Sequence, residues 1–310
     1  MYDSINFWFD RYLVDNFNLS TITTCLTGIS EHQSDKGYFV SGSLNNLKVN
    51  IYESGVSVKG SLAKFHLTDN LHTLTRSGTH EAIEHLSDNL SLPMDKAKIT
   101  AVDIATHFIM KYPPNNYYSF LGAKKYFTRL QASTDTLYYN TKPKQLIFYD
   151  KVLESTNKKV EIPKIYQNTN LLRYEMRHKG RLNNQFNISE FTGATLYNER
   201  FYIDIINRWV KEYININKIQ SLTISNMNTI KKPDEAFKAI CGIAFQKMGQ
   251  SEIEAIFNDF KAQKTFTDPK YYSRLKEMLF SAMNKKEISE KSELINELDQ
   301  NIKQIKHYYR

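Results

Sequence analysis

The chain has 310 residues with 41 Lys or Arg and 33 Asp or Glu, a formal net charge of +8, and is long enough for one large or two ordinary domains with hydrophobic cores. Two cysteines, Cys25 and Cys241, are too few for a disulfide framework or a thiolate metal site. No apolar run approaches the roughly 20 residues that cross a bilayer, and no basic head precedes an apolar N-terminal stretch. We therefore expect no membrane partner, no signal peptide and a cytoplasmic location.

The first 90 residues combine short strand patterns with one helix pattern. Residues 1–9 place Ile5, Phe7 and Phe9 at alternate positions, which predicts a first strand with these three side chains inward. Residues 37–64 contain several short alternating runs separated by Asn and Gly turns, a pattern that is typical of hairpins. A helix is expected over residues 79–90, with Thr79 as its N-cap.

A further strand is expected over residues 98–107, and it carries an acid in an unusual setting. Alternation places Asp103 on the same face as His107, with an alanine on either side of the acid. Small neighbours leave space above a carboxylate, which suits a metal ion or a phosphate better than a packed core. A turn-capping aspartate is the alternative. A lone histidine is more often a hydrogen-bonded core residue than a ligand, so we leave His107 out of the site.

Further strands are expected around residues 126–131, 136–139 and 145–149, and the last of these ends in Tyr149. A phenol with a pKa near 10 is a weak nucleophile, so a cation beside it would have to stabilise its anion. Lys151 follows two residues later and is expected to share the face of Tyr149 if the strand continues.

Two other tyrosines lie close to Tyr149 in the sequence. Tyr138 and Tyr139 stand in the preceding strand, where they could pack in the core or stack on bases. The ordinary interpretation of any tyrosine that ends an apolar strand is an amphipathic core residue with a solvated hydroxyl. Tyr149 is preferred over Tyr138 and Tyr139 as the candidate nucleophile only because of the motifs around it.

The segment 171–177 places Arg173, Glu175 and Arg177 on one strand face. If this strand lies beside the two strands just described, Glu175 comes close to Asp103 and to the tyrosine. Two carboxylates can bind one hard divalent cation, and arginines bind phosphates in a bidentate way. The alternative is a neutralised charge ladder on a solvated strand face.

The C-terminal third differs in character from the rest. Residues 197–216 form an amphipathic helix pattern, and residues 218–310 are almost wholly helical in pattern. We therefore expect a β-rich domain over residues 1–216 and a helical domain over 217–310. Apolar residues from Ile288 to Ile305 recur at near-heptad spacing, which predicts either a coiled coil or, as we prefer, a helix packed on its own domain.

Positive charge is concentrated in one window. Residues 111–185 contain 14 Lys and Arg against 5 Asp and Glu, a net charge of +9 that exceeds the surplus of the whole chain. Tyrosines and phenylalanines are interleaved with these cations. A basic surface with aromatic rings is typical of nucleic-acid binding, with salt-sensitive affinity. A lysine-rich solvated surface is the alternative.

The order of these motifs resembles the replication initiators of filamentous phages and related plasmids, the gene II/X type of rolling-circle initiator. The resemblance spans roughly residues 1–215 and rests on the segments 1–5, 58–64, 99–113, 148–154 and 172–177. It implies an α+β fold: an antiparallel-sheet nickase core built from two β-rich units with packed helices, followed by a helical C-terminal domain.

The resemblance also implies an activity, site residues and partners. Tyr149 would attack a phosphodiester of origin DNA and form a 5′-phosphotyrosine, with Lys151 stabilising the phenolate and Mg²⁺ or Mn²⁺ held by Asp103 and Glu175. Relatives can carry an acid where this chain has Ser57, so Glu154 is the expected third ligand. Further cations would position the DNA backbone: Lys59, Lys64, Lys142, Lys144, Arg173 and Arg177.

The implied substrate is double-strand origin DNA with an exposed single strand, in the cytoplasm of a bacterial host. A host helicase and a second copy of the chain stay open as partners. Two other functions stay open as well: a relaxase or transposase that uses the same chemistry for DNA mobilisation, and a DNA-binding regulator without activity.

Overall fold

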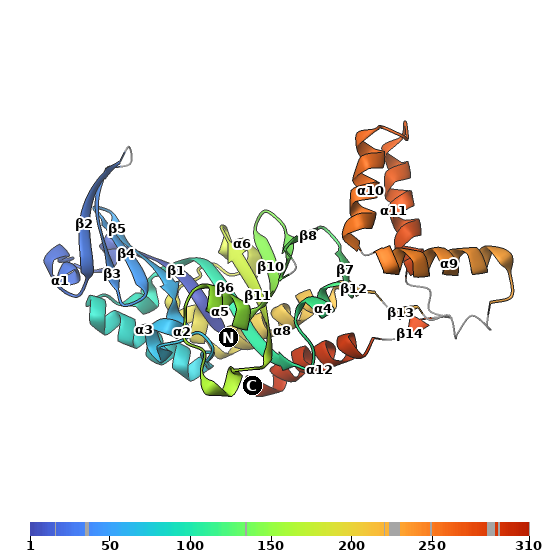
Figure 1. The fold of residues 1–310 in the computed structure, drawn as a ribbon. Helices are drawn as coiled ribbons and strands as arrows, with labels where there is room; N and C mark the ends of the chain where they lie inside the picture. Colours follow the sequence, from blue (N-terminus) through green and yellow to red (C-terminus); the bar gives the residue numbers. More distant parts are fainter. Residues whose placement is uncertain are drawn as a thin grey trace.

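The computed structural model describes residues 1–15, 17–34, 37–133, 135–219, 221–222, 230–248, 250–283, 289–290 and 292–309. These residues form a ten-stranded antiparallel sheet in the order β2-β3-β4-β5-β1-β6-β11-β10-β9-β8 (Figure 1). Its strands are β1 (Tyr2–Asp10), β2 (Thr27–Ser34), β3 (Gly37–Leu44), β4 (Leu47–Tyr52), β5 (Gly55–Ser61), β6 (Lys98–Met110), β8 (Thr128–Ser133), β9 (Thr136–Asn140), β10 (Lys144–Asp150) and β11 (Asn170–Lys179). Short pairs form between β7 (Leu121–Lys124) and β12 (Ile216–Lys218), and between β13 (Ser221–Leu222) and β14 (Ser289–Glu290).

The α-helices lie on and around this sheet. They are α1 (Leu19–Thr24), α2 (Leu62–Leu67), α3 (Arg76–Leu90), α4 (Asn115–Tyr118), α5 (Lys151–Asn157), α6 (Leu182–Phe186), α7 (Gly193–Tyr197), α8 (Glu199–Ile214), α9 (Pro233–Met248), α10 (Gln250–Ala262), α11 (Pro269–Met283) and α12 (Glu293–Tyr308). Single 3-10 turns occur at η1 (Arg11–Leu13), η2 (Met94–Lys96) and η3 (Lys164–Tyr166). The predicted α+β class is therefore confirmed.

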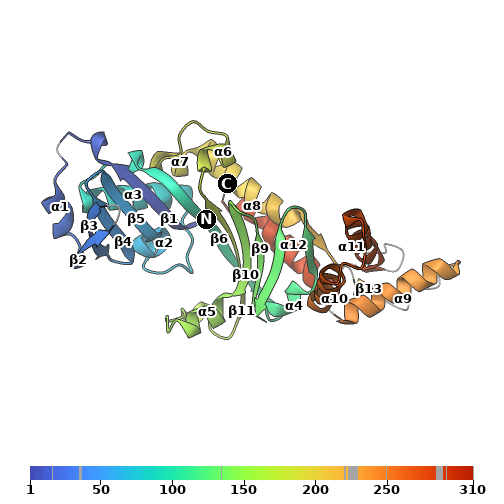
Figure 2. The same ribbon diagram turned by 90° about the horizontal axis from the view of Figure 1, so that it is seen from above.

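The sheet consists of two five-stranded halves that meet at β1 and β6. Outward from β1 run β5, β4, β3 and β2, and outward from β6 run β11, β10, β9 and β8 (Figure 2). Two β-rich units are thus present, as the sequence predicts. The strand that carries Asp103, β6, lies where the two halves meet and pairs with β1 on one side and with β11 on the other.

Most expected elements form at the expected places. The N-cap of the first long helix is an exception: α3 begins one turn earlier, and its cap is Thr75, whose Oγ1 accepts a hydrogen bond from the N–H of Gly78 at 3.1 Å. Thr79, the predicted cap, lies inside the helix and is fully buried. The Thr79 hydroxyl donates a hydrogen bond to the carbonyl oxygen of Thr75, so this buried polar group has its partner one turn earlier in the same segment.

The hydrophobic core lies between one face of the sheet and a layer that includes α3 and α8. Under the second half, the Tyr174 ring stacks on Phe148 with centroids 4.5 Å apart and lies 4.4 Å from Trp209 of α8. The Tyr174 hydroxyl donates to the carbonyl of Trp209 at 3.2 Å. Burying these large rings fixes α8 against β10 and β11 and leaves the opposite face of the same strands for polar side chains.

The C-terminal helices do not all pack together. Ala239 of α9 forms a small cluster with Ile230 and Ile243, separate from the main core, and α9, α10 and α11 project from one end of the molecule (Figure 1). By contrast, the apolar face of α12 belongs to the main core through Leu298 and its neighbours. This helix therefore packs on its own chain, as preferred above, although Ile288, the first residue of the heptad pattern, lies outside the described residues.

Within the part of the chain that the structure describes, no helix is both long enough and apolar enough to span a membrane.

Candidate active site

Three neighbouring strands bring the predicted site residues to one face of the sheet. On β11, Arg177 lies directly opposite Asp103 of β6, and Arg173 lies opposite Tyr149 of β10. Glu175 stands between the two arginines on the same face. Because side chains alternate along a strand, this register places all five polar groups on the side away from α8.

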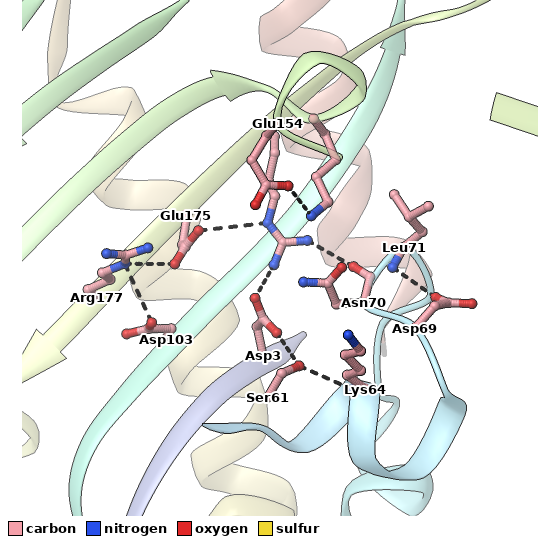
Figure 3. A network of polar contacts seen from close by, with 12 residues as sticks. Asp3, Ser61, Lys64, Asp69, Asn70, Leu71, Asp103, Glu154, Glu175 and Arg177 are labelled. Carbon is pink, nitrogen blue, oxygen red and sulfur yellow. Dashed lines mark hydrogen bonds and ion pairs between the residues drawn. The ribbon is translucent and has the colours of Figure 1, made fainter. Parts of the chain in front are cut away.

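The carboxylate of Glu175 joins the nucleophile candidate to the second acid. Its Oε2 accepts a hydrogen bond from the Tyr149 hydroxyl at 3.3 Å. Its Oε1 lies 2.7 Å from Nε of Arg177, and the same Nε lies 3.4 Å from Oδ2 of Asp103 (Figure 3). The carboxylates of Asp103 and Glu175 therefore approach the same position from two strands, and the guanidinium of Arg177 occupies that position.

Arg173 is the buried centre of this network. Only 1% of it is exposed, its guanidinium forms an ion pair with Asp3 of β1, and its Nε lies 3.7 Å from Glu175. A further N–H donates to the carbonyl oxygen of Asn70 at 3.0 Å. The structure thus corrects the expectation that Arg173 binds DNA, because its donors face protein groups and the side chain does not reach the surface.

Asp3 is the residue that sequence reasoning missed. It is buried, it accepts a hydrogen bond from the Ser61 hydroxyl at 2.5 Å, and it pairs with Arg173 across the intervening strand β6. The resemblance did include the opening segment of the chain, so an acid in the first strand was the available signal. Ser61 also accepts the backbone N–H of Lys64, which ties α2 to this corner of the site (Figure 3).

Burial dominates the electrostatics of the site. It raises the pKa of the Asp103 carboxyl to about 7, and the charge of Glu175 adds to this shift while Arg177 opposes it. Burial also raises the pKa of Tyr149 well above the ordinary value of a phenol, and the Arg173 charge only partly opposes it. The phenol is therefore neutral in the resting protein, and its hydrogen bond to Glu175 is a phenol–carboxylate bond.

A cavity of about 460 Å³ opens beside Tyr149, Glu175 and Arg177, whereas Asp103 and Arg173 are not part of its lining. Residues of β1, β9, β10, α5 and β11 line it, together with Asn70. The lining contains Tyr149 with both Glu175 and Arg177, and Tyr138 lies on the same wall. Tyr139 lies elsewhere: it is fully buried on the other face, and its hydroxyl donates to the carbonyl oxygens of Leu121 and Gly122.

Lys151 and Glu154 do not take the expected places. The strand ends at Asp150, whose side chain caps α5, so Lys151 is the first residue of a helix and not the next residue of the strand. Lys151 is buried and its Nζ lies 2.7 Å from Oε2 of Glu154. Burial and the charge of Arg173 lower the pKa of Lys151. Glu154 also pairs with Lys158; it lines the same cavity as Tyr149 and Glu175, but among the described residues it forms no three-acid cluster with Asp103 and Glu175.

The predicted DNA-binding lysines fall into two groups. Lys59 of β5 and Lys64 of α2 are exposed on or beside the half of the sheet that contains β1. Lys142 is exposed in the turn before β10. Lys144 instead faces the helical layer, where its Nζ lies 2.5 Å from the carboxylate of Glu212 on α8. The structure therefore places Lys144 on the face opposite to the cavity.

Of the predicted metal ligands, only the carboxylates of Asp103 and Glu175 lie close enough together to hold a divalent cation. Among the described residues, no three His, Cys, Asp or Glu side chains lie close enough together to hold a metal ion, so the expected trio with Glu154 is not assembled. Asp103 and Glu175 do converge on Arg177, and burial followed by the charge of Glu175 raises the pKa of Asp103. Mg²⁺ is commonly bound by one or two carboxylates with substrate phosphates and water completing its shell, which these two residues could support.

The chain is similar to known proteins at the level of a family. A family described as the N-terminal part of a replication-associated phage protein, the gene II product, matches residues 1–209. This range contains both halves of the sheet and every residue of the network in Figure 3. None of the curated proteins matches the chain.

Proposed function

Because the chain belongs to the family of gene II-type, replication-associated phage initiators, we propose that it starts rolling-circle replication by nicking one strand of origin DNA with Tyr149. The family supports a role in replication initiation and in binding origin DNA. The nicking chemistry, its nucleophile and its cation are our proposal.

One observation carries the proposal: the hydroxyl of Tyr149 lies in a polar cavity and donates to Glu175 at 3.3 Å. The hydroxyl of the fully buried Tyr139, by comparison, donates to backbone carbonyl oxygens and lines no part of this cavity. Tyr149 instead meets a carboxylate that can accept its proton, and this is the pairing of nucleophile and base that covalent catalysis needs.

Tyr149, Glu175 and water together account for every bond and proton of this reaction. The Tyr149 oxygen attacks the phosphorus while its proton passes to Oε2 of Glu175. The bond between phosphorus and the 3′ oxygen breaks, and the released 3′ oxygen takes a proton from water. The products are a 5′-phosphotyrosine and a 3′-hydroxyl that can prime synthesis. In the reverse reaction a 3′-hydroxyl attacks the phosphorus and gives its proton to water, the bond between phosphorus and the tyrosine oxygen breaks, and Glu175 returns its proton to that oxygen.

Other side chains in the network hold this geometry. Arg173 fixes Glu175 from the buried side through its contacts with Asp3 and the backbone of Asn70. The side chain of Arg177 is about one-third exposed and lines the cavity, so it is placed to meet a phosphate. A divalent cation held by Asp103 and Glu175 would add positive charge beside the scissile phosphate.

The test is formation of a covalent protein–DNA adduct. The protein is incubated with supercoiled DNA carrying its own replication origin and with Mg²⁺ or Mn²⁺. We expect an open circle with protein attached at one 5′ end, and mass spectrometry should locate the phosphate on Tyr149. The Tyr149→Phe variant should bind the same DNA and form no adduct.

The matched control is Tyr138→Phe, because Tyr138 lines the same cavity and is half-buried. This variant should nick as the wild type does. If Tyr149→Phe still forms the adduct while Tyr138→Phe does not, the nucleophile is wrongly assigned. A wild-type protein that binds origin DNA without ever forming an adduct would instead support the non-catalytic regulator.

A further inference from the structure

The first half of the sheet has a face of its own, opposite to the core, that the proposed chemistry does not use. Its outward side chains on β1 to β5 are polar, basic and aromatic, whereas the inward ones, such as Phe7 and Val58, are fully buried. We call this surface the outer face of the β1–β5 half. It is continuous with the cavity, since Ser4 of β1 lines the cavity and the next outward residues, Asn6 and Trp8, follow along the same strand.

Four aromatic side chains form a row across this face. The His32 and Phe39 rings stack with centroids 4.7 Å apart, Phe39 and Tyr52 stack at 5.1 Å, and Trp8 lies 5.8 Å from Tyr52 at a tilt of 45°. We call these residues the aromatic row. None of the four is buried, and His32 is exposed. Cross-strand ring pairs also stabilise a sheet, so the row by itself does not identify a ligand.

A second observation points to an anion. Lys48 of β4 and Lys59 of β5 are direct cross-strand partners on this face, and both are exposed. Like charges placed opposite each other destabilise a strand pair, and neither lysine forms an ion pair with any residue that the structure describes. A phosphate between the two lysines would remove this repulsion. Asn6 lies opposite Lys59 on β1, next to the cavity side of the pair.

From these features we infer that the outer face of the β1–β5 half binds the unpaired DNA strand and guides it to the cavity. This inference rests on the proposed function and extends it to a specific binding surface. Phosphates lie at Lys48 and Lys59, and bases pack on the aromatic row, whose rings accept any base because every base has an aromatic face. The outward residues Ser4, Asn6 and Trp8 span roughly 13 Å along β1, so the row and the cavity are within reach of one short strand.

Trp8 provides a direct measurement. The chain has two tryptophans, and the other, Trp209, is fully buried under the sheet. Base stacking near Trp8 should therefore quench the accessible part of the tryptophan fluorescence. We would titrate the full-length Tyr149→Phe protein with an oligothymidylate of about 20 nucleotides. Quenching that vanishes in Trp8→Phe supports the inference, and binding with no change in Trp8 emission would overturn it.

Substitutions separate the contribution of the rings from that of the charges. Phe39→Leu and Tyr52→Leu keep apolar bulk but remove the ring, and each should weaken oligothymidylate binding by about tenfold. The matched control is Tyr271→Leu, a partly exposed tyrosine on α11, which should bind as the parent does. Circular dichroism at the same concentrations checks that each variant is folded. Unchanged affinity in both folded ring variants contradicts the inference.

The paired substitution Lys48→Gln with Lys59→Gln addresses the phosphate contacts. It should flatten the slope of log affinity against log salt by about 1.4, because each contact to a single strand contributes about 0.7. A polyanion without bases, such as polyphosphate, should compete for the lysines without quenching Trp8. If polyphosphate quenches as strongly as DNA, the face is a general anion surface and the inference fails.

The two proposals fail in different ways. If the wild type forms no adduct but oligothymidylate still quenches Trp8, the proposal that Tyr149 nicks DNA is wrong and the proposal that the outer face binds single-stranded DNA is supported. If the wild type forms the adduct and the variants of the aromatic row bind and nick as it does, the surface is wrong and the chemistry stands.

Discussion

The guanidinium of Arg173 on β11 pairs with the carboxylate of Asp3 on β1, across the strand β6 that separates them. This pair links the two halves of the sheet beneath the cavity. Both residues are buried, and Arg173 is almost completely removed from solvent. A buried charge that loses its partner is costly, so this contact should matter more to stability than the ion pairs on the surface.

Replacing Arg173 with Met should lower the free energy of unfolding by about 3–5 kcal/mol, because Asp3 would stay buried without a cation. Adding Asp3→Asn should recover part of this loss, which urea denaturation of the two single variants and the double variant would measure. The matched control is Arg208→Met, since the pair of Arg208 with Asp204 on α8 is partly exposed and should contribute at most about 1 kcal/mol. Equal losses for the two arginine variants would contradict the buried role of Arg173.

Asp103→Asn should raise the Mg²⁺ or Mn²⁺ concentration needed for half-maximal adduct formation by about tenfold or more, since one of two converging carboxylates is lost. The fold should be kept, because the substitution removes a charge that burial disfavours. Glu154→Gln is the comparison, as Glu154 is engaged with Lys151 and Lys158. A larger metal shift in Glu154→Gln than in Asp103→Asn would show that the third expected ligand is the real one.

Strand alternation explains why much of the site was predictable from sequence. Once residues 98–107, 145–149 and 171–177 are taken as strands, the period of two decides which face Asp103, Tyr149 and Glu175 occupy. The structure places all three on that face. The same rule puts Lys144 on the core side of the strand with Leu146 and Phe148. The sequence therefore also predicts that Lys144 lies on the face opposite to Tyr149.

The role of Asp3 could not be read from alternation. In a regular strand Asp3 would share the face of Ile5 and Phe7, which are core residues. The pairing of β1 with β6 shifts register between Tyr2 and Ile5, and such an irregularity redirects the side chains near it. The carboxylate of Asp3 consequently meets Arg173. Without that partner in view, Arg173 looked like a free cation for DNA.

Acid should destabilise the protein partly through His178. Its Nδ1 lies 2.7 Å from Oε1 of Gln185, an acceptor, so Nδ1 carries the hydrogen. Its Nε2 is buried without a partner, and burial lowers the pKa of this histidine from about 6.5 to about 4. A lowered pKa in the native state means that stability is complete above pH 6.5 and falls as the unfolded chain takes up the proton. The loss reaches on the order of 3 kcal/mol below pH 4.

His178→Gln keeps an N–H donor toward Gln185 and removes the titration. The variant should therefore lose less stability than the wild type between pH 7 and pH 4 in urea denaturation. The exposed His80, which lies beside Glu84 on α3, is the matched position for comparison, and His80→Gln should follow the wild-type profile within about 1 kcal/mol. Parallel profiles for His178→Gln and the wild type would show that His178 does not contribute to the acid sensitivity.

Residues 293–308 should be required for the stability of the sheet-containing core, although they belong to the segment that was expected to form a separate helical domain. Leu298 of α12 is fully buried in the main core, and the next residue, Asp299, accepts a hydrogen bond of 2.7 Å from the Tyr213 hydroxyl of α8. Leu298→Ala should lower the free energy of unfolding by about 2–5 kcal/mol, the usual cost of emptying a buried leucine site. Met278→Ala on α11, where the side chain is 60% exposed, should change it by less than about 0.5 kcal/mol. Trp209 fluorescence follows the unfolding of the core directly, and an unchanged Trp209 transition in Leu298→Ala would mean that α12 unfolds independently of the sheet.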